Sequence, residues 1–321
     1  MSENKKSGAE VASSSLFLDS LNRASDDDIC AITEEWEKKR SAERKSNIIR
    51  YILMGFFILV ALISVISIVR TLAGYRKAEN FYSDMYAYLD DGGASIASET
   101  ARIPSLDSFG TVNGPKGSSS AVYNQLFLRM RTRILSLKEI NPDIYGWVIV
   151  PGTENIDYPV LQGTDNDFYL NHEYTKGYMQ AGSIYADYHC DREVERNFNT
   201  VLYGHNMQND MMFSELIKFL DKDFFEKNEY VYLYTENGIY TYRIFSVFKA
   251  DYRSGYVETG FPSEEDFITF AKDMKSKSMY ERTGIEFDEN SRIITLSTCT
   301  NGLKSDRYCV QGLLVDVYYQ P

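Results

Sequence analysis

The stretch TLSTCTNGLKSDRYCV, residues 295–310, runs from one strand-like segment through a polar loop into a second strand-like segment. β-Branched and aromatic residues favour extended backbone at its two ends, and the Asn, Gly, Ser and Asp between them favour a turn. Cys299 stands where the first segment ends, and Arg307 stands where the second begins. If the two segments pair as strands, the guanidinium returns beside the thiol, where a permanent cation stabilises a thiolate or an oxyanion.

Similar strand-like runs fill the chain upstream of this stretch, with turn residues between them. About eight strands in roughly 180 residues are typical of a closed β-barrel or of a sandwich. The expected strands are Gly146–Val150, Tyr158–Leu161, Ser183–Ala186, Thr200–Tyr203, Tyr230–Tyr234, Gly238–Ala250, Arg292–Thr298 and Tyr308–Tyr319.

Helical spacing of apolar residues predicts three helices around these strands. One covers residues 121–140 and stops at an Asn-Pro pair, and a second lies near Met212–Leu220. The third lies in an insert at residues 262–284, where Ser263 is the expected N-cap and Asp266 follows three residues later.

A long apolar segment, Tyr51–Val69, contains no charged residue and is bracketed by Arg50 and Arg70. At about 1.5 Å per residue it spans about 28 Å as a helix, close to the thickness of a bilayer core. Lys and Arg are more frequent before it than after it, so we expect a single-pass anchor in the cell membrane, with residues 1–50 cytoplasmic and residues 70–321 outside.

The remaining boundaries follow from composition. Residues 70–120 are expected to hold a short extracytoplasmic helix and a Gly-, Ser- and Pro-rich linker, and residues 121–321 a catalytic domain. The formal net charge of −12 argues against nucleic acid as a partner. The four cysteines form no CxxC pair, so a zinc-ribbon or thioredoxin-type site has no support. No metal site and no cofactor is expected. Whether Cys190 and Cys309 form a disulfide stays open.

The chain has three histidines, and a base-assisted thiol needs one of them as its partner. His205 has the best context, because it follows a strand and Gly204 lets the chain turn so that the ring projects. His189 adjoins Cys190, but adjacent residues of an extended chain point to opposite faces. His172 is expected at the surface.

Taken alone, Cys299 is also compatible with a buried structural thiol, and Arg307 with a surface cation near Asp306. Their combination resembles a known family. TLSTC with an arginine eight residues after its cysteine, and LYGHN about ninety residues earlier, are similar to the motifs of class B sortases. Further similar stretches are NPDIYGWVIVPGT, IDYPVLQGTDNDFYLNHEY and AGSIYAD. The resemblance covers about residues 121–320.

The resemblance implies a mainly β fold. It consists of a closed eight-stranded sortase-type barrel with N-terminal helices and an inserted helix before the catalytic strand, preceded by one transmembrane helix. It implies Cys299 as nucleophile, His205 as general acid and base, and Arg307 as the residue that stabilises the oxyanion or positions the substrate. It also suggests five substrate contacts: Asn166, Leu170, Tyr203, Ser297 and Thr298. Some class B members carry an acidic residue soon after the cysteine, and here Thr300 and Asn301 follow instead.

The implied reaction is cleavage of a C-terminal sorting signal after Thr and transfer of the protein, through a thioacyl intermediate, to an amine. The implied partners are secreted proteins that bear the signal, a cell-wall precursor or pilin amine, and membrane lipid. Two other functions stay open: a membrane-anchored cysteine peptidase or amidase that only hydrolyses, and a non-catalytic surface binding module. A pilus-polymerising sortase is a variant of the first reading, although residues 108–120 are a poor match for a lid.

Overall fold

The computed structural model describes residues 26–89, 118–299 and 305–319. The chain divides into two compact units, one ending at Thr71 and the other beginning at Leu72. The first unit consists, in its described part, of the long helix α2, whose bounds are Asp26–Leu89 and which continues into the second unit. The expected apolar segment and the short helix expected after it are therefore parts of one uninterrupted helix, which begins 25 residues before Tyr51.

The apolar part of α2 has the properties of a membrane-spanning helix. Its large apolar side chains from Ile48 to Leu72 are exposed, and its mean hydropathy reaches 3.0. The hydroxyls of Ser64 and Ser67 donate to the carbonyl oxygens of Val60 and Ile63, so these polar groups are satisfied within the helix. In the described part of the chain, α2 is the one helix long and apolar enough to cross a membrane.

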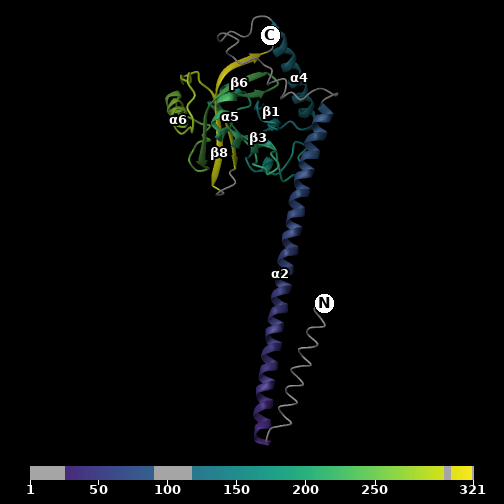
Figure 1. Cartoon of the computed structure of the whole chain (residues 1–321). Coiled ribbons are helices and arrows are strands. Elements are labelled where there is room, and N and C mark those ends of the chain that lie inside the picture. Colours follow the sequence, from purple (N-terminus) through teal and green to yellow (C-terminus); the bar gives the residue numbers. More distant parts are fainter. Residues whose placement is uncertain (1–25, 90–117, 300–304, 320–321) are drawn as a thin grey trace. The chain divides into compact units, whose positions relative to one another are not determined.

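In its described part, the second unit contains eight strands that close into a barrel (Figure 1). Around the barrel the order is β1-β2-β3-β4-β7-β8-β6-β5, and β5 pairs with β1 to complete it. The β2–β3 and β4–β7 pairs are parallel, and the others are antiparallel. The bounds are β1 Ile144–Ile149, β2 Asp157–Leu161, β3 Ile184–Ala186, β4 Asn199–Tyr203, β5 Tyr230–Tyr234, β6 Gly238–Asp251, β7 Ile293–Cys299 and β8 Asp306–Tyr319.

The barrel prediction is confirmed, and a sandwich is excluded. All eight predicted strands are present, with ends that differ by no more than two residues from the expected ones. Strand β1 is buried along its whole length, and Trp147 within it is fully buried. The indole nitrogen of Trp147 donates to the Asp157 carboxylate at 2.6 Å, which satisfies the one polar group of that side chain.

Helices lie outside the barrel and cover parts of it. Helix α4 packs against β1 and β5, and α6 packs against β6 through Phe267, Ala271 and Met274. The hydroxyl of Ser263 accepts from the Asp266 backbone N–H at 3.1 Å, so the predicted N-cap of α6 is confirmed. The helical elements of this unit are α4 Ser118–Ile140, η2 Phe168–Leu170, η3 Val194–Arg196, η4 Ser214–Leu220, α5 Lys222–Lys227 and α6 Glu264–Ser276.

The last turns of α2, residues 72–89, pack on the barrel unit. The hydroxyl of Tyr82 donates to the carbonyl oxygen of Gly182 at 3.1 Å, and the Lys77 ammonium donates to that of Tyr178 at 3.1 Å. Both acceptors belong to residues 162–183, which we call the β2–β3 loop. The helix therefore supports this loop from one side, and the loop contributes to the site described next.

The two cysteines whose pairing the sequence did not decide form no disulfide with each other. Cys190 and Cys309 are both buried and free. Burial raises the pKa of each thiol, that of Cys190 to about 12, so neither is disposed to act as a nucleophile near neutral pH.

Candidate active site

The pairing of β7 with β8 brings the ends of the quoted stretch together. In this antiparallel ladder Cys299 and Arg307 are Cα partners. The predicted return of the arginine beside the cysteine is thus a direct consequence of the hairpin register. Cys299 is the last residue of β7, and Arg307 is the second residue of β8.

The parallel pairing of β4 with β7 brings the histidine to the same end of the barrel. Tyr203, the last residue of β4, is the Cα partner of Ser297, and the Gly204 backbone N–H donates to the Ser297 carbonyl at 3.2 Å. His205 and Cys299 each lie two residues further along. The three predicted catalytic residues therefore come from three neighbouring strands and lie at one mouth of the barrel.

Gly204 is needed before the histidine for a different reason from the expected one. The positive-φ glycines of the described chain are Gly152, Gly182, Gly255 and Gly284, so Gly204 does not adopt a conformation reserved for glycine. A Cβ at Gly204 would instead lie 2.4 Å from the Ile184 side chain and 2.8 Å from the ring of Phe213. The position lacks a side chain because the core leaves no room for one.

The imidazole of His205 is held by the β2–β3 loop. Its Nε2 lies 2.7 Å from the carbonyl oxygen of Leu170, and the residue is half-buried. Burial lowers the pKa of His205 below the usual 6.5, and the hydrogen bond to Leu170 partly opposes that effect. The net shift favours the neutral imidazole, which is the form able to accept a proton.

Arg307 is half-buried, and its guanidinium makes two contacts. Nη1 donates to the carbonyl oxygen of Asp306 at 2.9 Å, and the guanidinium carbon lies 5.6 Å from the ring centre of Tyr252. The Asp306 carboxylate itself pairs with the Lys249 ammonium at 3.3 Å. These contacts fix a cation beside the end of β7, where an anion formed at that strand end would be stabilised.

A hollow of about 400 Å³ opens between these residues. His205 and Arg307 line it, and so do all five residues proposed as substrate contacts: Asn166, Leu170, Tyr203, Ser297 and Thr298. The hydroxyls of Ser297 and Tyr256 lie 2.7 Å apart, which orients both at the wall of the hollow. The structure therefore gathers every described side chain of the predicted site at one cavity.

Further lining residues were not expected from the sequence. Asp167 lies in the β2–β3 loop, beside the predicted Asn166. Tyr252, Tyr256 and Val257 lie in the segment that follows β6, and Tyr185 lies in β3. The sequence contained an indication for Tyr252, Tyr256 and Val257. A strand that pairs with the arginine-bearing strand must end beside the arginine, and Ala250 is the Cα partner of Arg307.

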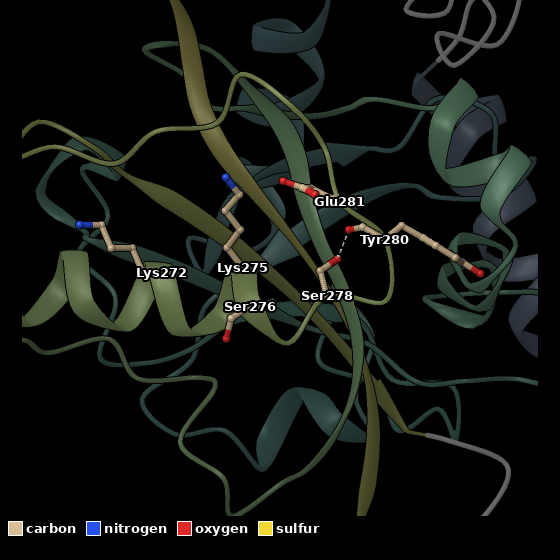
Figure 2. A pocket seen from close by; sticks show the side chains of 6 residues that line it. All are labelled: Lys272, Lys275, Ser276, Ser278, Tyr280 and Glu281. Atoms are coloured by element: carbon tan, nitrogen blue, oxygen red, sulfur yellow. Dashed lines mark hydrogen bonds between the residues drawn. The ribbon is translucent and has the colours of Figure 1, made fainter.

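A second hollow, of about 340 Å³, lies beside α6 and has different chemistry (Figure 2). Its six lining residues are Lys272, Lys275, Ser276, Ser278, Tyr280 and Glu281. Tyr280 extends away from the lysines in Figure 2, and its hydroxyl donates to the Leu220 carbonyl at 2.6 Å. Neither a cysteine nor a histidine is among these described residues, whereas His205 and Arg307 both line the first hollow.

Comparison with known proteins agrees with this assignment. The sortase domain model matches residues 148–315. Sortase B of Listeria monocytogenes is 39% identical over 190 residues, which make up 58% of this chain and 75% of that protein. An X-ray structure of a mutant form of Clostridium perfringens sortase B has a TM-score of 0.57 and 37% identity, and the match covers 60% of this chain and 91% of that chain. A Staphylococcus aureus sortase B–substrate complex has a TM-score of 0.54 and 31% identity, with 60% and 91% covered.

A closed barrel with a cysteine and an arginine on paired strands, together with these matches, defines the class of protein: the chain belongs to the sortase family. Within that family it is a class B sortase, as its relatives and structural neighbours are. It is accordingly a cysteine transpeptidase. The resemblance read from the sequence motifs is confirmed.

Proposed function

We propose that this class B sortase cleaves a C-terminal sorting signal after Thr and joins the released protein to a cell-wall or pilin amine. Cys299 is the nucleophile, His205 the general acid and base, and Arg307 the stabiliser of the oxyanion. The observation that carries the proposal is the strand register, which pairs Cys299 with Arg307 and brings His205 to the same mouth of the barrel.

In the first half of the reaction the Cys299 thiolate attacks the carbonyl carbon of the substrate threonine. A carbon–sulfur bond forms, and the carbonyl oxygen becomes an oxyanion that the Arg307 guanidinium is placed to stabilise. Collapse breaks the peptide carbon–nitrogen bond, and protonated His205 gives its proton to the departing amine. The result is a thioacyl enzyme and a free C-terminal fragment.

In the second half an acceptor amine attacks the thioacyl carbon. Neutral His205 takes the proton that the attacking nitrogen loses, and the carbon–sulfur bond breaks to return the thiolate. Because the carbonyl of Leu170 can only accept, Nε2 keeps its hydrogen and Nδ1 is the nitrogen that gains and loses the proton. The lowered pKa of His205 suits the second half, in which the ring must be neutral.

The hollow supplies the substrate groove. Asn166 and Leu170 form part of one wall, Tyr203 lies at the end of β4, and Ser297 and Thr298 precede the nucleophile on β7. An extended peptide with its threonine carbonyl at the end of β7 would contact all five. Their hydroxyl and amide groups offer hydrogen bonds to a peptide backbone, while Leu170 offers an apolar contact.

Membrane anchoring places the enzyme where exported substrates are. The apolar part of α2 spans the membrane, residues 1–50 are cytoplasmic, and the barrel lies outside. The support is the excess of positive charge before the span. The basic residues on that side are Lys38, Lys39, Arg40, Arg44, Lys45 and Arg50, against Arg70, Arg76 and Lys77 on the other.

The test is a transpeptidation assay with the full chain in detergent micelles. The substrates are a panel of peptides with sorting signals of the Asn-Pro-x-Thr-Asn and Leu-Pro-x-Thr-Gly types, each supplied with and without an amine acceptor. Mass spectrometry should find cleavage after Thr and a ligated product, and Cys299→Ala should abolish both. A thioacyl adduct on the wild-type protein should be trapped when the acceptor is omitted.

The other outcomes distinguish the remaining functions. Cleavage that added amine never diverts into ligated product would indicate a hydrolase, and no cleavage of any peptide would contradict the proposed function. For the membrane orientation, a thiol-reactive probe that cannot cross membranes should label an engineered cysteine in residues 70–321 of intact cells, and labelling confined to residues 1–50 would reverse the topology.

A further inference from the structure

Asp187 is a buried carboxylate that follows directly on β3. One of its oxygens, Oδ2, accepts hydrogen bonds from the side-chain amide of Asn166 and from the hydroxyl of Tyr203, each at 2.9 Å. The other oxygen, Oδ1, accepts from the backbone N–H of His189 at 3.0 Å and lies 2.9 Å from that residue's Nδ1. Both oxygens of the carboxylate are therefore engaged.

The two side chains on Oδ2 come from different parts of the chain and form part of the groove. Asn166 belongs to the β2–β3 loop and Tyr203 ends β4, and both line the hollow that Asp187 itself does not line. The opposite end of the Asn166 carboxamide is fixed too, because its Oδ1 accepts from the Tyr188 backbone N–H at 3.2 Å. One carboxylate thus connects the β2–β3 loop to the end of strand β4.

The charge state of Asp187 determines which atoms the groove presents. Burial alone would raise the pKa of Asp187, but the hydrogen bonds from His189, Tyr203 and Asn166 outweigh it and lower the pKa. An ionised carboxylate only accepts, so the hydroxyl hydrogen of Tyr203 is directed at Asp187. Burial and the neighbouring charge of Asp187 raise the pKa of Tyr203, so its hydroxyl stays protonated and offers lone pairs to the hollow.

We propose that Asp187 is a positioning residue that sets the hydrogen-bonding polarity of this groove wall, making Tyr203 an acceptor and Asn166 a donor. Such a pair matches the N–H and C=O groups of a peptide in extended conformation. Because Asp187 is not at the reacting atoms, its contribution is to substrate binding and not to bond making. The inference rests on the proposed function, since it assigns Asn166 and Tyr203 to the substrate groove.

The test substitutes Asp187→Asn in the full chain in micelles and measures KM for the sorting-signal peptide separately from kcat. The amide keeps the size of the side chain but loses an acceptor and gains a donor, so Tyr203 is free to turn its hydrogen toward the substrate. We expect KM to rise about tenfold or more, the loss typical of a hydrogen bond to a charged group, with kcat within about threefold of wild type.

Glu195→Gln is the matched control. Glu195 is also a carboxylate that accepts from two tyrosine hydroxyls, those of Tyr240 and Tyr319, and its pKa is also lowered. Tyr319 ends β8, whereas Arg307 lies at its beginning, so this cluster is remote from the groove. The control variant should leave KM unchanged, which separates a positioning effect from general loosening of the barrel.

A second comparison tests whether Asp187 acts through Tyr203. In the Tyr203→Phe background the hydroxyl is already absent, so Asp187→Asn should raise KM by a smaller factor than it does in wild type. An unchanged KM in Asp187→Asn, an equal rise in Glu195→Gln, or a full-sized rise in the Tyr203→Phe background would each overturn the inference.

Nuclear magnetic resonance of the side-chain amide of Asn166 gives a readout that needs no turnover. In the wild-type protein its two amide protons should have separate resonances and slow exchange with water, and Asp187→Asn should shift them and accelerate exchange. Resonances that do not change would overturn the positioning claim. A wild-type protein that ligates nothing while Asn166 responds to Asp187→Asn would contradict the proposed function and leave the positioning role standing.

Discussion

Nε2 of His205 lies 2.7 Å from the backbone carbonyl oxygen of Leu170, so a residue at the end of one strand is oriented by a loop that joins two others. The hydrogen bond assigns the tautomer, because a carbonyl has no hydrogen to give. It also makes the orientation of the His205 ring, the proposed base, depend on the backbone conformation of the β2–β3 loop. Any change that moves the Leu170 carbonyl should therefore move the imidazole.

Gly182→Ala should lower activity by this route. Gly182 has a positive φ of 56°, and a Cβ there would lie 2.3 Å from the carbonyl oxygen of Leu170, the acceptor for His205. The added methyl group must displace that oxygen. We expect kcat to fall by about 10- to 100-fold, a range consistent with a small misplacement of a catalytic group. Steady-state ligation kinetics measure the effect.

Gly255→Ala is the control for the backbone strain that any side chain feels at positive φ. Gly255 has a φ of 74°, and nothing lies within 4 Å of the position its Cβ would take. This variant should lose about 1 kcal/mol of stability from the left-handed backbone and keep its kcat. Equal loss of kcat in the two variants would show that the Leu170 carbonyl does not position His205.

The pH dependence of stability should report the lowered pKa of the half-buried His205. The pKa of His205 is lowered in the folded state, so the unfolded chain binds the proton more tightly. The stability that this site contributes is complete above the usual pKa of 6.5 and is lost as the pH falls from there through the lowered folded value. Denaturant unfolding at pH 7.5 and pH 5.5 should therefore show a smaller loss for His205→Gln than for wild type.

Imidazole resonances of the native protein provide the direct check, with His205→Gln used for assignment. A midpoint below 6.5 for His205 is the expected result. A midpoint above that value would mean that the carbonyl of Leu170 outweighs burial, and the neutral ring would then not be the resting form.

The sequence was sufficient for the strands because most of them are short apolar runs between turn residues. It also predicted the meeting of Cys299 with Arg307, since a hairpin joins residues at the two ends of one loop. The inserted helix was recognisable by its cap at Ser263. Helix α5 was missed because Lys222–Lys227 is too short to show helical periodicity.

What the sequence could not give is the set of contacts between distant segments. Asp187 is 21 residues from Asn166 and 16 from Tyr203, and no local pattern marks a carboxylate that will accept from both. Likewise, the sequence suggested that Gly204 is required for a turn. The structure shows that glycine is required there because the Phe213 ring packs against it. Such relationships depend on strand order, which short motifs do not encode.

Two arginines contact the ring of Tyr252, and comparing them tests whether Arg307 stabilises the oxyanion. Arg307 and Arg253 have their guanidinium carbons 5.6 and 5.5 Å from the ring centre of the same tyrosine, but Arg253 is paired with the exposed Asp251 carboxylate. Arg307→Lys should lower kcat/KM by about 10²- to 10³-fold, the loss seen when an oxyanion donor is removed, because an ammonium cannot reproduce the planar fork.

Arg253→Lys preserves charge in the same way and should change kcat/KM by less than about twofold, since its partner is exposed and such pairs contribute little. If both variants lost activity equally, the role of Arg307 would be to organise the Tyr252 segment and not to stabilise the transition state. Ligation kinetics with one sorting-signal peptide are sufficient to compare them.

The cap of α6 should affect stability without affecting catalysis. The Ser263 hydroxyl accepts from the Asp266 backbone N–H and donates to the Asp266 carboxylate at 2.7 Å, and Glu264, Glu265 and Asp266 place negative charge in the first turn. Ser263→Ala leaves that N–H without its acceptor and should lower the free energy of unfolding by about 1 kcal/mol, measured as a lower denaturant midpoint at unchanged slope.

Ser276→Ala, at the other end of the helix, is the control. It removes a hydroxyl that only donates to the Asp273 carbonyl at 2.7 Å, and it should lower the free energy of unfolding by less. Because α6 packs on β6 through side chains that neither change touches, kcat and KM should stay at wild-type values; a loss of ligation activity in Ser263→Ala alone would show that the inserted helix takes part in the reaction.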